Sequence, residues 1–281
     1  MIVGFLGFGE VASVLSGCLK DCGVEVYTSI ENRSLKTQTR AKEQSINICK
    51  DNRGLAEISD ILISSVTPAE AVNIAKEVGG YTKGIYVDIN NISPLTARTA
   101  LSYIRNGKTV DAAIMGGVKK EVCQVLIIAS GEYAVQFSML NEYGLNIRVL
   151  NHDIGRAKTL KMLRSYYTKG VSALLFESLL KAYQLGVDDE FLKCLAITEC
   201  PEFRKSTISR IINSALHAKR KSEEMYEVLK FIEDESHLKL KQNEHKIMAE
   251  STKEFFKTIF KNIKPNEEPD GYKEIFELFK N

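Results

Sequence analysis

Residues 1–13 read MIVGFLGFGEVAS, and they place three glycines within an otherwise apolar run of nine residues. A secretory signal peptide would begin with basic residues and continue with a longer apolar stretch, so this pattern does not fit one. A short buried strand that ends in a glycine turn fits it better. The turn has the spacing G-x-G-x-x-A and leads into a helix, which is the sequence context of a dinucleotide-binding turn.

Each small residue of this spacing has a physical purpose. The first glycine, Gly7, allows a tight turn, and the second, Gly9, lets a pyrophosphate approach the backbone. Ala12 lets the helix pack closely on the strand, and the phosphates then meet free N–H groups at the helix N-terminus. The sequence therefore predicts a cofactor-binding turn, which comprises Gly7, Phe8, Gly9, Glu10, Val11 and Ala12.

Up to about residue 150, short β-rich runs alternate with amphipathic stretches. The runs are 2–6, 24–28, 46–49, 61–66, 85–88, 109–113, 125–129 and 147–150, and the stretches include 11–20, 69–78 and 94–105. Such alternation is typical of right-handed βαβ units. We therefore expect an α/β fold of the Rossmann type, with a doubly wound and mostly parallel sheet.

After Asp153 only helical patterns follow. They cover about 154–186, 188–199, about 202–235, 239–261 and a short stretch after Pro269. The sequence therefore predicts two domains: residues 1–153 bind the dinucleotide, and residues 154–281 form an all-helical domain for substrate and dimerisation. The predicted helices at 154–186 and 202–235 are too long for so small a domain to cover, so we expect a homodimer formed through the helical halves.

The composition excludes several classes of partner. The 281 residues are 44% hydrophobic and 26% charged, and Lys+Arg at 38 against Asp+Glu at 36 gives a net charge of +2. This balance gives no reason to expect nucleic acid or a membrane surface as a partner. No apolar run approaches the roughly 18 residues of a membrane-spanning helix.

Cysteine usage indicates the compartment. The six cysteines form no C-x-x-C pair, so we expect free thiols and a reducing cytoplasm. Cys18 and Cys22 are spaced i, i+4 on the first predicted helix. Small buried side chains are favoured there over a metal site, and no metal is expected.

The loop after the second predicted strand indicates which dinucleotide binds. NAD enzymes usually place an acidic residue at the tip of this strand to hold the ribose hydroxyls. Here Thr28 and Ser29 end the strand, Glu31 comes late, and Arg33 and Ser34 follow. A guanidinium and hydroxyls suit a 2′-phosphate, so NADP is favoured over NAD; the alternative is a polar surface loop.

Four further stretches follow in a definite order. Residues 65–72 read SVTPAEAV, 88–94 read DINNISP, 111–117 read DAAIMGG and 155–165 read GRAKTLKMLRS. They resemble the V-x-x-P, D-x-S-T-x-x-P, D-A-P-V-S-G-G and G-x-G-x-x-x-K-x-x-x-N motifs of the β-hydroxyacid dehydrogenases. This superfamily includes the 6-phosphogluconate and 3-hydroxyisobutyrate dehydrogenases. The chain is most similar to a prokaryotic branch with a shorter helical C-terminal domain.

The resemblance implies hydride transfer between a nicotinamide and a small hydroxy or keto acid, with Lys161 as general acid and base. It also implies that Val66, Thr67 and Pro68 border the nicotinamide half of the cofactor. Substrate-facing positions would be Asn91, Met115, Gly116, Gly117, Arg164 and Ser165. Methionine stands here where the family has serine, and Ser165 where it has asparagine, so the substrate itself is left open.

Several of these residues have alternative interpretations. A lysine can move a proton near neutral pH if desolvation and a cationic neighbour lower its pKa from ~10.4, and Arg164, one turn away, could supply that repulsion and bind a substrate carboxylate. Asn91 either hydrogen-bonds cofactor and substrate or caps the following helix, and Gly116 and Gly117 either offer N–H groups or form a plain turn. His217 lies either at a substrate-binding edge or on an exposed polar stripe.

Two other functions also fit the sequence. The same fold could reduce an imine, because the altered substrate motif leaves room for a different substrate. A non-catalytic NADP-binding sensor or partner protein is the remaining alternative. The leading interpretation is an NADP-dependent oxidoreductase that acts on a small acidic metabolite.

Overall fold

The structure is a computed structural model that describes residues 1–31, 33–105, 107–117, 124–150, 153–199, 202–234, 247–263, 269 and 271–278. The chain packs as two compact units, Met1–Lys161 and Met162–Asn281. The domain boundary expected between residues 153 and 154 lies just before helix α7 (Arg156–Gln184), whereas the two units divide within that helix.

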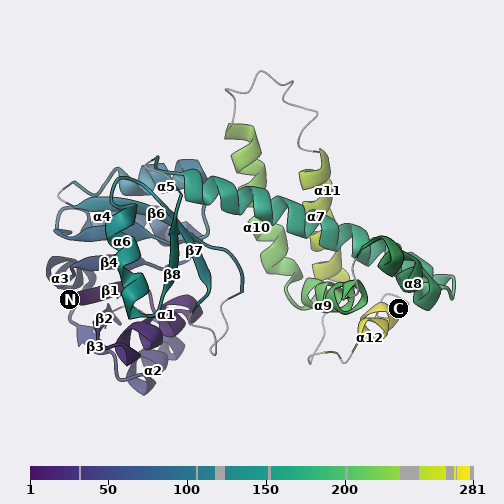
Figure 1. The fold of residues 1–281 in the computed structure, drawn as a ribbon, viewed down its shortest axis with the longest axis horizontal. Coiled ribbons are helices and arrows are strands. Elements are labelled where there is room, and N and C mark those ends of the chain that lie inside the picture. Colours follow the sequence, from purple (N-terminus) through teal and green to yellow (C-terminus); the bar gives the residue numbers. More distant parts are fainter. Residues whose placement is uncertain are drawn as a thin grey trace. The chain divides into compact units, whose positions relative to one another are not determined.

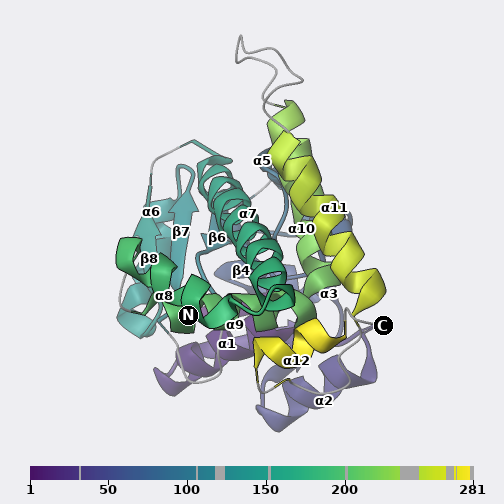
Figure 2. The same ribbon diagram turned by 90° about the vertical axis from the view of Figure 1, so that its right-hand side faces the viewer.

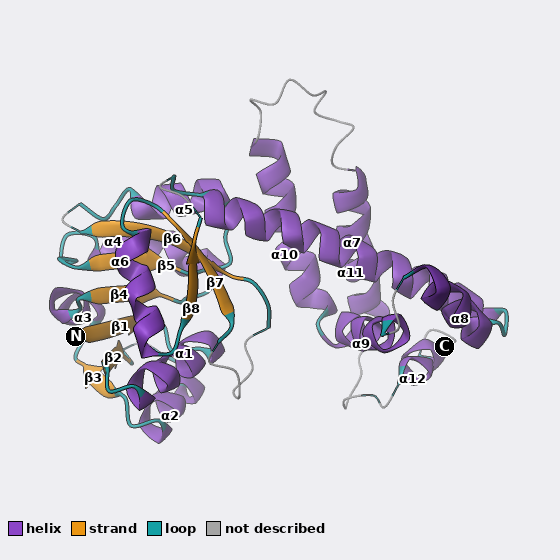
Figure 3. Ribbon diagram, viewed as in Figure 1, coloured by secondary structure: helices purple, strands orange, loops and turns teal. Residues whose placement is uncertain are grey.

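The first unit is built on one eight-stranded sheet with the order β3-β2-β1-β4-β5-β6-β7-β8 (Figure 3). The strands are β1 (Ile2–Leu6), β2 (Glu25–Ser29), β3 (Asn47–Cys49), β4 (Ile61–Ser64), β5 (Ile85–Asp88), β6 (Lys108–Ile114), β7 (Leu126–Ser130) and β8 (Asn146–Val149). Every neighbouring pair is parallel except β6 and β7, which are antiparallel. This topology confirms the predicted doubly wound, mostly parallel sheet.

Helices cover both faces of this sheet (Figure 1). They are α1 (Glu10–Asp21), α2 (Leu35–Glu43), α3 (Asn52–Ile58), α4 (Ala71–Val78), α5 (Pro94–Leu101) and α6 (Ala134–Ser138), with short 3₁₀ helices η1 (Pro68–Glu70) and η2 (Met139–Tyr143). Successive strand residues alternate between two cores, because side chains in a strand point to opposite faces. Val87 packs with α1 and α6 on one face, and Tyr86 packs with α3, α4 and α5 on the other.

The described part of the second unit is helical, as the sequence predicts. After α7 it contains α8 (Asp188–Thr198), α9 (Phe203–Leu216), α10 (Ala218–Asp234), α11 (Ile247–Asn262) and α12 (Tyr272–Glu277). Helices α10 and α11 lie side by side (Figure 2). The expected helix at 239–261 begins within residues 239–246, which lie outside the described residues.

The single long helix expected at about 202–235 is wrong. The chain leaves helical geometry at His217, with φ −117° and ψ 23°, so that α9 and α10 are separate helices. No glycine or proline lies between residues 202 and 235, which is why the sequence suggests one helix. The break lets Ile211 pack in one core with Phe276, whereas Met225 packs in another with Phe256.

The expectation of free thiols is wrong for Cys18. Cys18 is engaged in a disulfide bond, whereas Cys22, Cys49 and Cys194 carry free thiols. A cysteine that is buried on the packed face of α1 can be a free thiol or part of a disulfide bond, so the amino-acid composition alone could not distinguish the two forms. Among the residues that the structure describes, no group of side chains could hold a metal ion.

None of the helices in the described ranges is long and apolar enough to span a bilayer.

Candidate functional site

The glycine turn between β1 and α1 has the geometry of a phosphate cradle. Gly7 has φ +82°, and a Cβ at this position would lie 2.6 Å from the carbonyl oxygen of Ser65. Gly9 precedes α1 without a side-chain cap among the described residues, and no heavy atom lies within 4 Å of where its Cβ would be. Since the first N–H groups of a helix have no intrahelical acceptor, this open helix start fits a pyrophosphate.

At the end of β2, two predicted cofactor residues serve the protein itself. Thr28 Oγ1 donates to the carbonyl oxygen of Phe5 at 2.8 Å, which ties β2 to β1. Ser29 is buried, and its Oγ accepts from the N–H of Glu31 at 3.4 Å. These contacts fix the shape of the loop that follows the strand.

The loop after β2 carries Arg33. Arg33 Nε is buried and has no hydrogen-bond partner among the described residues. Ser34 Oγ accepts from the N–H of Thr37 and so caps α2. Arg40 on α2 reaches back to the glycine turn, where its Nη1 donates to the carbonyl oxygen of Phe8 at 3.3 Å. Arg33 and Arg40 thus add positive charge after β2, and Arg40 brings its charge to the glycine turn.

The loops after β4 and β5 are joined by Asn90. Its Oδ1 accepts from the N–H of Val66 at 2.7 Å, and its Nδ2 donates to Ser64 Oγ at 3.0 Å. Thr67 and Pro68, which follow Val66, are exposed. Asn90 thus holds the loop that was expected to border the nicotinamide.

Asn91 does not cap helix α5. Ser93 is the N-cap, and its Oγ accepts from the N–H of Thr96 at 3.1 Å, so the capping interpretation of Asn91 is wrong. Asn91 Oδ1 is buried and finds no hydrogen-bond partner within the described ranges. An unpaired buried carbonyl oxygen costs free energy unless a ligand supplies a donor, and the carboxamide of a nicotinamide is such a donor.

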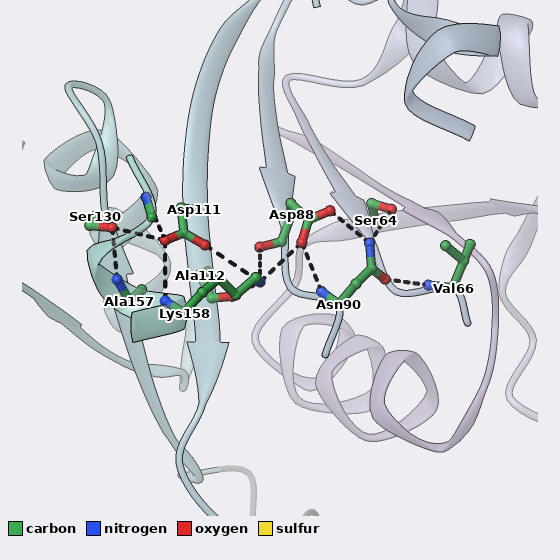
Figure 4. Close-up of polar contacts among 10 residues, drawn as sticks. Ser64, Val66, Asp88, Asn90, Asp111, Ala112, Ser130, Ala157 and Lys158 are labelled. Atoms are coloured by element: carbon green, nitrogen blue, oxygen red, sulfur yellow. Dashed lines mark hydrogen bonds and ion pairs between the residues drawn. The ribbon is translucent and has the colours of Figure 1, made fainter. Parts of the chain in front are cut away.

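Lys158 forms the centre of a buried polar network between the carboxyl end of β5 and the middle of β6 (Figure 4). Its fully buried Nζ lies 3.0 Å from Asp88 Oδ1 and 3.5 Å from Asp111 Oδ1. It also donates to the carbonyl oxygens of Asp88 and Ala112. The side-chain amide nitrogen of Asn90, Nδ2, donates to the other carboxylate oxygen of Asp88, Oδ2, at 2.8 Å. The network therefore links α7 to the loops after β4 and β5.

Asp111 anchors the start of α7. Its Oδ2 accepts from the N–H groups of Gly155 at 3.0 Å and Lys158 at 3.3 Å, and from Ser130 Oγ at 3.1 Å. A carboxylate at this position also interacts favourably with the positive end of the helix dipole. Burial raises the pKa of Asp111, Lys158 opposes this rise, and the neighbouring Asp88 adds to it. Two buried carboxylates thus share one ammonium.

The predicted substrate residues occupy both units. Lys161 is half-buried on α7, one turn after Lys158, and ends the first unit. Met115 is half-buried directly after β6, and Gly116 and Gly117, which follow it, are exposed. The second unit contains the remaining three: Arg164 is exposed, Ser165 is buried, and His217 is exposed at the end of α9.

Sequence reasoning missed Lys158 and Arg40 as functional candidates. Lys158 offered one signal: a lysine in the first turn of a helix faces the positive end of the helix dipole, so its presence there calls for an explanation. Its partners are 70 and 46 residues away in sequence, and no local pattern indicates them. Arg40 has the ordinary appearance of a surface residue on an amphipathic helix.

Two family models match parts of the chain. Residues 2–92 match a family described as NADP oxidoreductase, coenzyme F420-dependent, and residues 182–259 match a domain of unknown function. A protein of Methanothermus fervidus, described as an uncharacterized 28.5 kDa protein in the 7S RNA 5′ region, is 44% identical over 92% of this chain and 99% of its own length.

Solved structures extend this picture. The conserved protein MTH1747, described as structurally similar to 3-hydroxyacid dehydrogenases, is 44% identical over 92% of this chain and 96% of its own, with a TM-score of 0.78. A 3-hydroxyisobutyrate dehydrogenase of Mycobacterium tuberculosis, solved with L-serine, shares the fold at 13% identity, with a TM-score of 0.76 over 100% of this chain and 99% of its own.

The chain belongs to the β-hydroxyacid dehydrogenase superfamily, whose members are NAD(P)-dependent dehydrogenases and reductases. Within it, the chain belongs to the family that contains MTH1747 and the Methanothermus fervidus protein. Its first unit is therefore a nicotinamide-dinucleotide-binding unit, and the glycine turn is the part of that unit suited to the phosphates.

Proposed function

We propose that the chain is an NADP-dependent oxidoreductase that transfers a hydride between the nicotinamide and a small hydroxy or keto acid. One observation carries this proposal. Two buried polar atoms without protein partners in the described ranges, Arg33 Nε and Asn91 Oδ1, follow the carboxyl ends of β2 and β5. The glycine turn follows β1, at the same edge of the sheet, and open α/β sheets bind their ligands at this edge.

The two atoms suit opposite ends of the cofactor. Arg33 would pair with the 2′-phosphate that distinguishes NADP from NAD. Arg40, which donates to the carbonyl oxygen of Phe8 in the glycine turn, would add a second positive charge. Asn91 Oδ1 would accept a hydrogen bond from the nicotinamide carboxamide and so orient the ring. The bound cofactor supplies or accepts the hydride, and the remaining steps fall to the chain's own residues.

Lys161 is the proposed proton-transfer group. As a hydroxyl is oxidised, its proton moves to Lys161 Nζ, and in the reverse direction Nζ returns it to the carbonyl oxygen. The Lys158 network supports this role, because it fixes the first turn of α7, which carries Lys161 one turn further on. Backbone N–H groups of Gly116 and Gly117 would bind the acid group, with Met115 shaping an apolar wall beside it.

A substrate screen tests the proposal. The protein is incubated with NADP⁺ and a panel of 2- and 3-hydroxy acids, and NADPH formation is followed by absorbance. Turnover of at least one hydroxy acid is expected. Reduction of cyclic imines by NADPH without any activity on hydroxy acids would favour an imine reductase, and tight NADPH binding without turnover of either class would favour a sensor.

A further inference from the structure

The second unit holds a cluster of cations around a single carboxylate. Lys169 Nζ on α7 lies 2.7 Å from Glu224 Oε2 on α10, and Arg220 Nε lies 3.5 Å from Glu224 Oε1. Lys221 follows Arg220, and Arg210 on α9 adds a further positive charge close enough to act on Lys221. Two of these four cations therefore pair with Glu224, and the other two add further positive charge beside them.

Lys221 is partly buried and, unlike Lys169 and Arg220, is not paired with Glu224 in the described part of the chain. Its Nζ donates to Ser214 Oγ at 2.9 Å and lies 5.2 Å from the centre of the Phe256 ring. Within the described ranges its ammonium forms no ion pair with a carboxylate. A half-buried ammonium that faces a hydroxyl and a ring, with other cations around it, costs free energy that an anion would recover.

The start of α10 adds to the positive potential. The helix covers 17 residues, Ala218–Asp234, and no acidic residue lies in its first turn. Lys219, Arg220 and Lys221 instead follow one another there, where the helix dipole already has its positive end and N–H groups lack intrahelical acceptors. Cations at this end of a helix are unfavourable by themselves and favourable once an anion binds.

We propose that the start of α10 is a binding site for a small dianionic group of the phosphate monoester class, held by Lys169, Arg220 and Lys221. A phosphate carries between one and two negative charges near pH 7, and so neutralises more of this cluster than a single carboxylate does. Every residue of the site belongs to the second unit, so the site does not depend on the proposed function.

The charge state of Lys221 agrees with such a site. Burial, followed by repulsion from Lys169, lowers the pKa of Lys221 to about 8, although Glu224 opposes this shift. The charged groups that face Lys221 are Lys169 from α7, Arg210 from α9, and Arg220 and Glu224 from its own helix, and α11 contributes the uncharged ring of Phe256. A bound dianion would keep the proton on Lys221, so binding should weaken as the pH rises above 8.

Calorimetric titration of the full chain with inorganic phosphate, without cofactor and at low ionic strength, tests the proposal. Saturable binding is expected at pH 7, and Lys221→Met should weaken it by at least about tenfold, because a charge-assisted hydrogen bond is lost. The matched control is Lys230→Met. Lys230 lies on the same helix and 4.5 Å from the Tyr226 ring, but outside the cluster, and its replacement should leave phosphate affinity unchanged.

Thermal unfolding supplies a second readout. Lys221→Met should unfold at a higher temperature than the unmodified protein in phosphate-free buffer, because a poorly compensated charge is removed, and phosphate should no longer stabilise it. Should that variant not fold, Arg220→Gln replaces it, since the Arg220 side chain is 66% exposed and its loss leaves the core intact. No saturable phosphate binding, or equal affinity in the variants and the control, would overturn the proposal.

Discussion

Lys161 carries the proposed proton transfer, and its role is testable once a substrate is found. Lys161→Ala should lower kcat by about 10² to 10⁴, the usual contribution of a general acid or base. NADPH affinity should change little, because the proposed phosphate site is the glycine turn and does not include Lys161. Lys161→Arg should not restore turnover, since a guanidinium does not release its proton near neutral pH.

Steady-state kinetics of these variants distinguish proton transfer by Lys161 from a purely electrostatic effect of its positive charge. Arg164→Ala should raise KM for an acidic substrate more than it lowers kcat. Lys193→Ala, at an exposed lysine of α8 paired with Glu190, is the control and should leave both constants unchanged. Near-normal turnover of Lys161→Arg would mean that the side chain acts as a fixed positive charge, and the general-base role would have to be abandoned.

Arg33 is the residue on which we propose that cofactor choice depends. Its buried Nε without a partner in the described ranges predicts that NADPH binds at least about tenfold more tightly than NADH, a difference of roughly 1.4 kcal/mol. Arg33→Ala should remove most of this preference, whereas Arg148→Ala, at an exposed arginine of β8, should preserve it. Fluorescence titration measures both affinities, and equal affinities in the unmodified protein would contradict the assignment.

At the scale of elements, Lys158 joins the first turn of α7 to the end of β5 and the middle of β6. Lys158→Met leaves the carboxylates of Asp88 and Asp111 buried without their cation, and should lower the free energy of unfolding by about 3–5 kcal/mol. Chemical denaturation measures this loss. The same substitution at Lys193, which is exposed, should change stability by less than about 0.5 kcal/mol.

The loss in Lys158→Met should also depend on pH. Burial already raises the pKa of Asp111 in the unmodified protein, and removal of the lysine takes away the interaction that opposes this rise. A carboxyl whose pKa is higher in the folded state binds a proton more readily when the chain is folded. The free energy of unfolding therefore increases as the pH falls from the pKa of the folded state to the pKa of the unfolded state. The deficit of Lys158→Met should therefore shrink in acid, and a deficit independent of pH would contradict this account of the network.

The elements differ in how far the sequence could predict them. The eight strands lie within two residues of their predicted bounds, because β-branched runs between glycine turns and amphipathic helices are a local signal. The break at His217 is not local, because it depends on which core each helix packs against, and no glycine or proline marks it in the sequence. The glycine turn could likewise be predicted from the sequence. The Lys158 network could not, because it joins residues far apart in sequence through contacts that exist only in the folded sheet.

At the scale of the whole molecule, we propose that the chain is a homodimer formed through the helical halves. The broken helix at His217 weakens one reason for this expectation, but α7 supplies a stronger one. Within the second unit, three large side chains at helical spacing remain exposed on α7: Leu163 at 51%, Tyr167 at 70% and Leu174 at 61%. Apolar side chains that line one face of a helix and stay exposed are typical of a surface that another chain covers.

Sedimentation of the unmodified protein at micromolar concentration should therefore give twice the mass of one chain. Tyr167→Glu should shift the equilibrium toward the monomer, because a buried carboxylate without a partner opposes association. Leu35→Glu introduces the same charge at an exposed leucine of the first unit, 81% accessible, and should leave the dimer intact. A monomer in the unmodified protein would overturn the expectation. A dimer insensitive to Tyr167→Glu would place the contact elsewhere, because a stable interface of roughly 1,200 Å² or more through α7 would have to bury this ring.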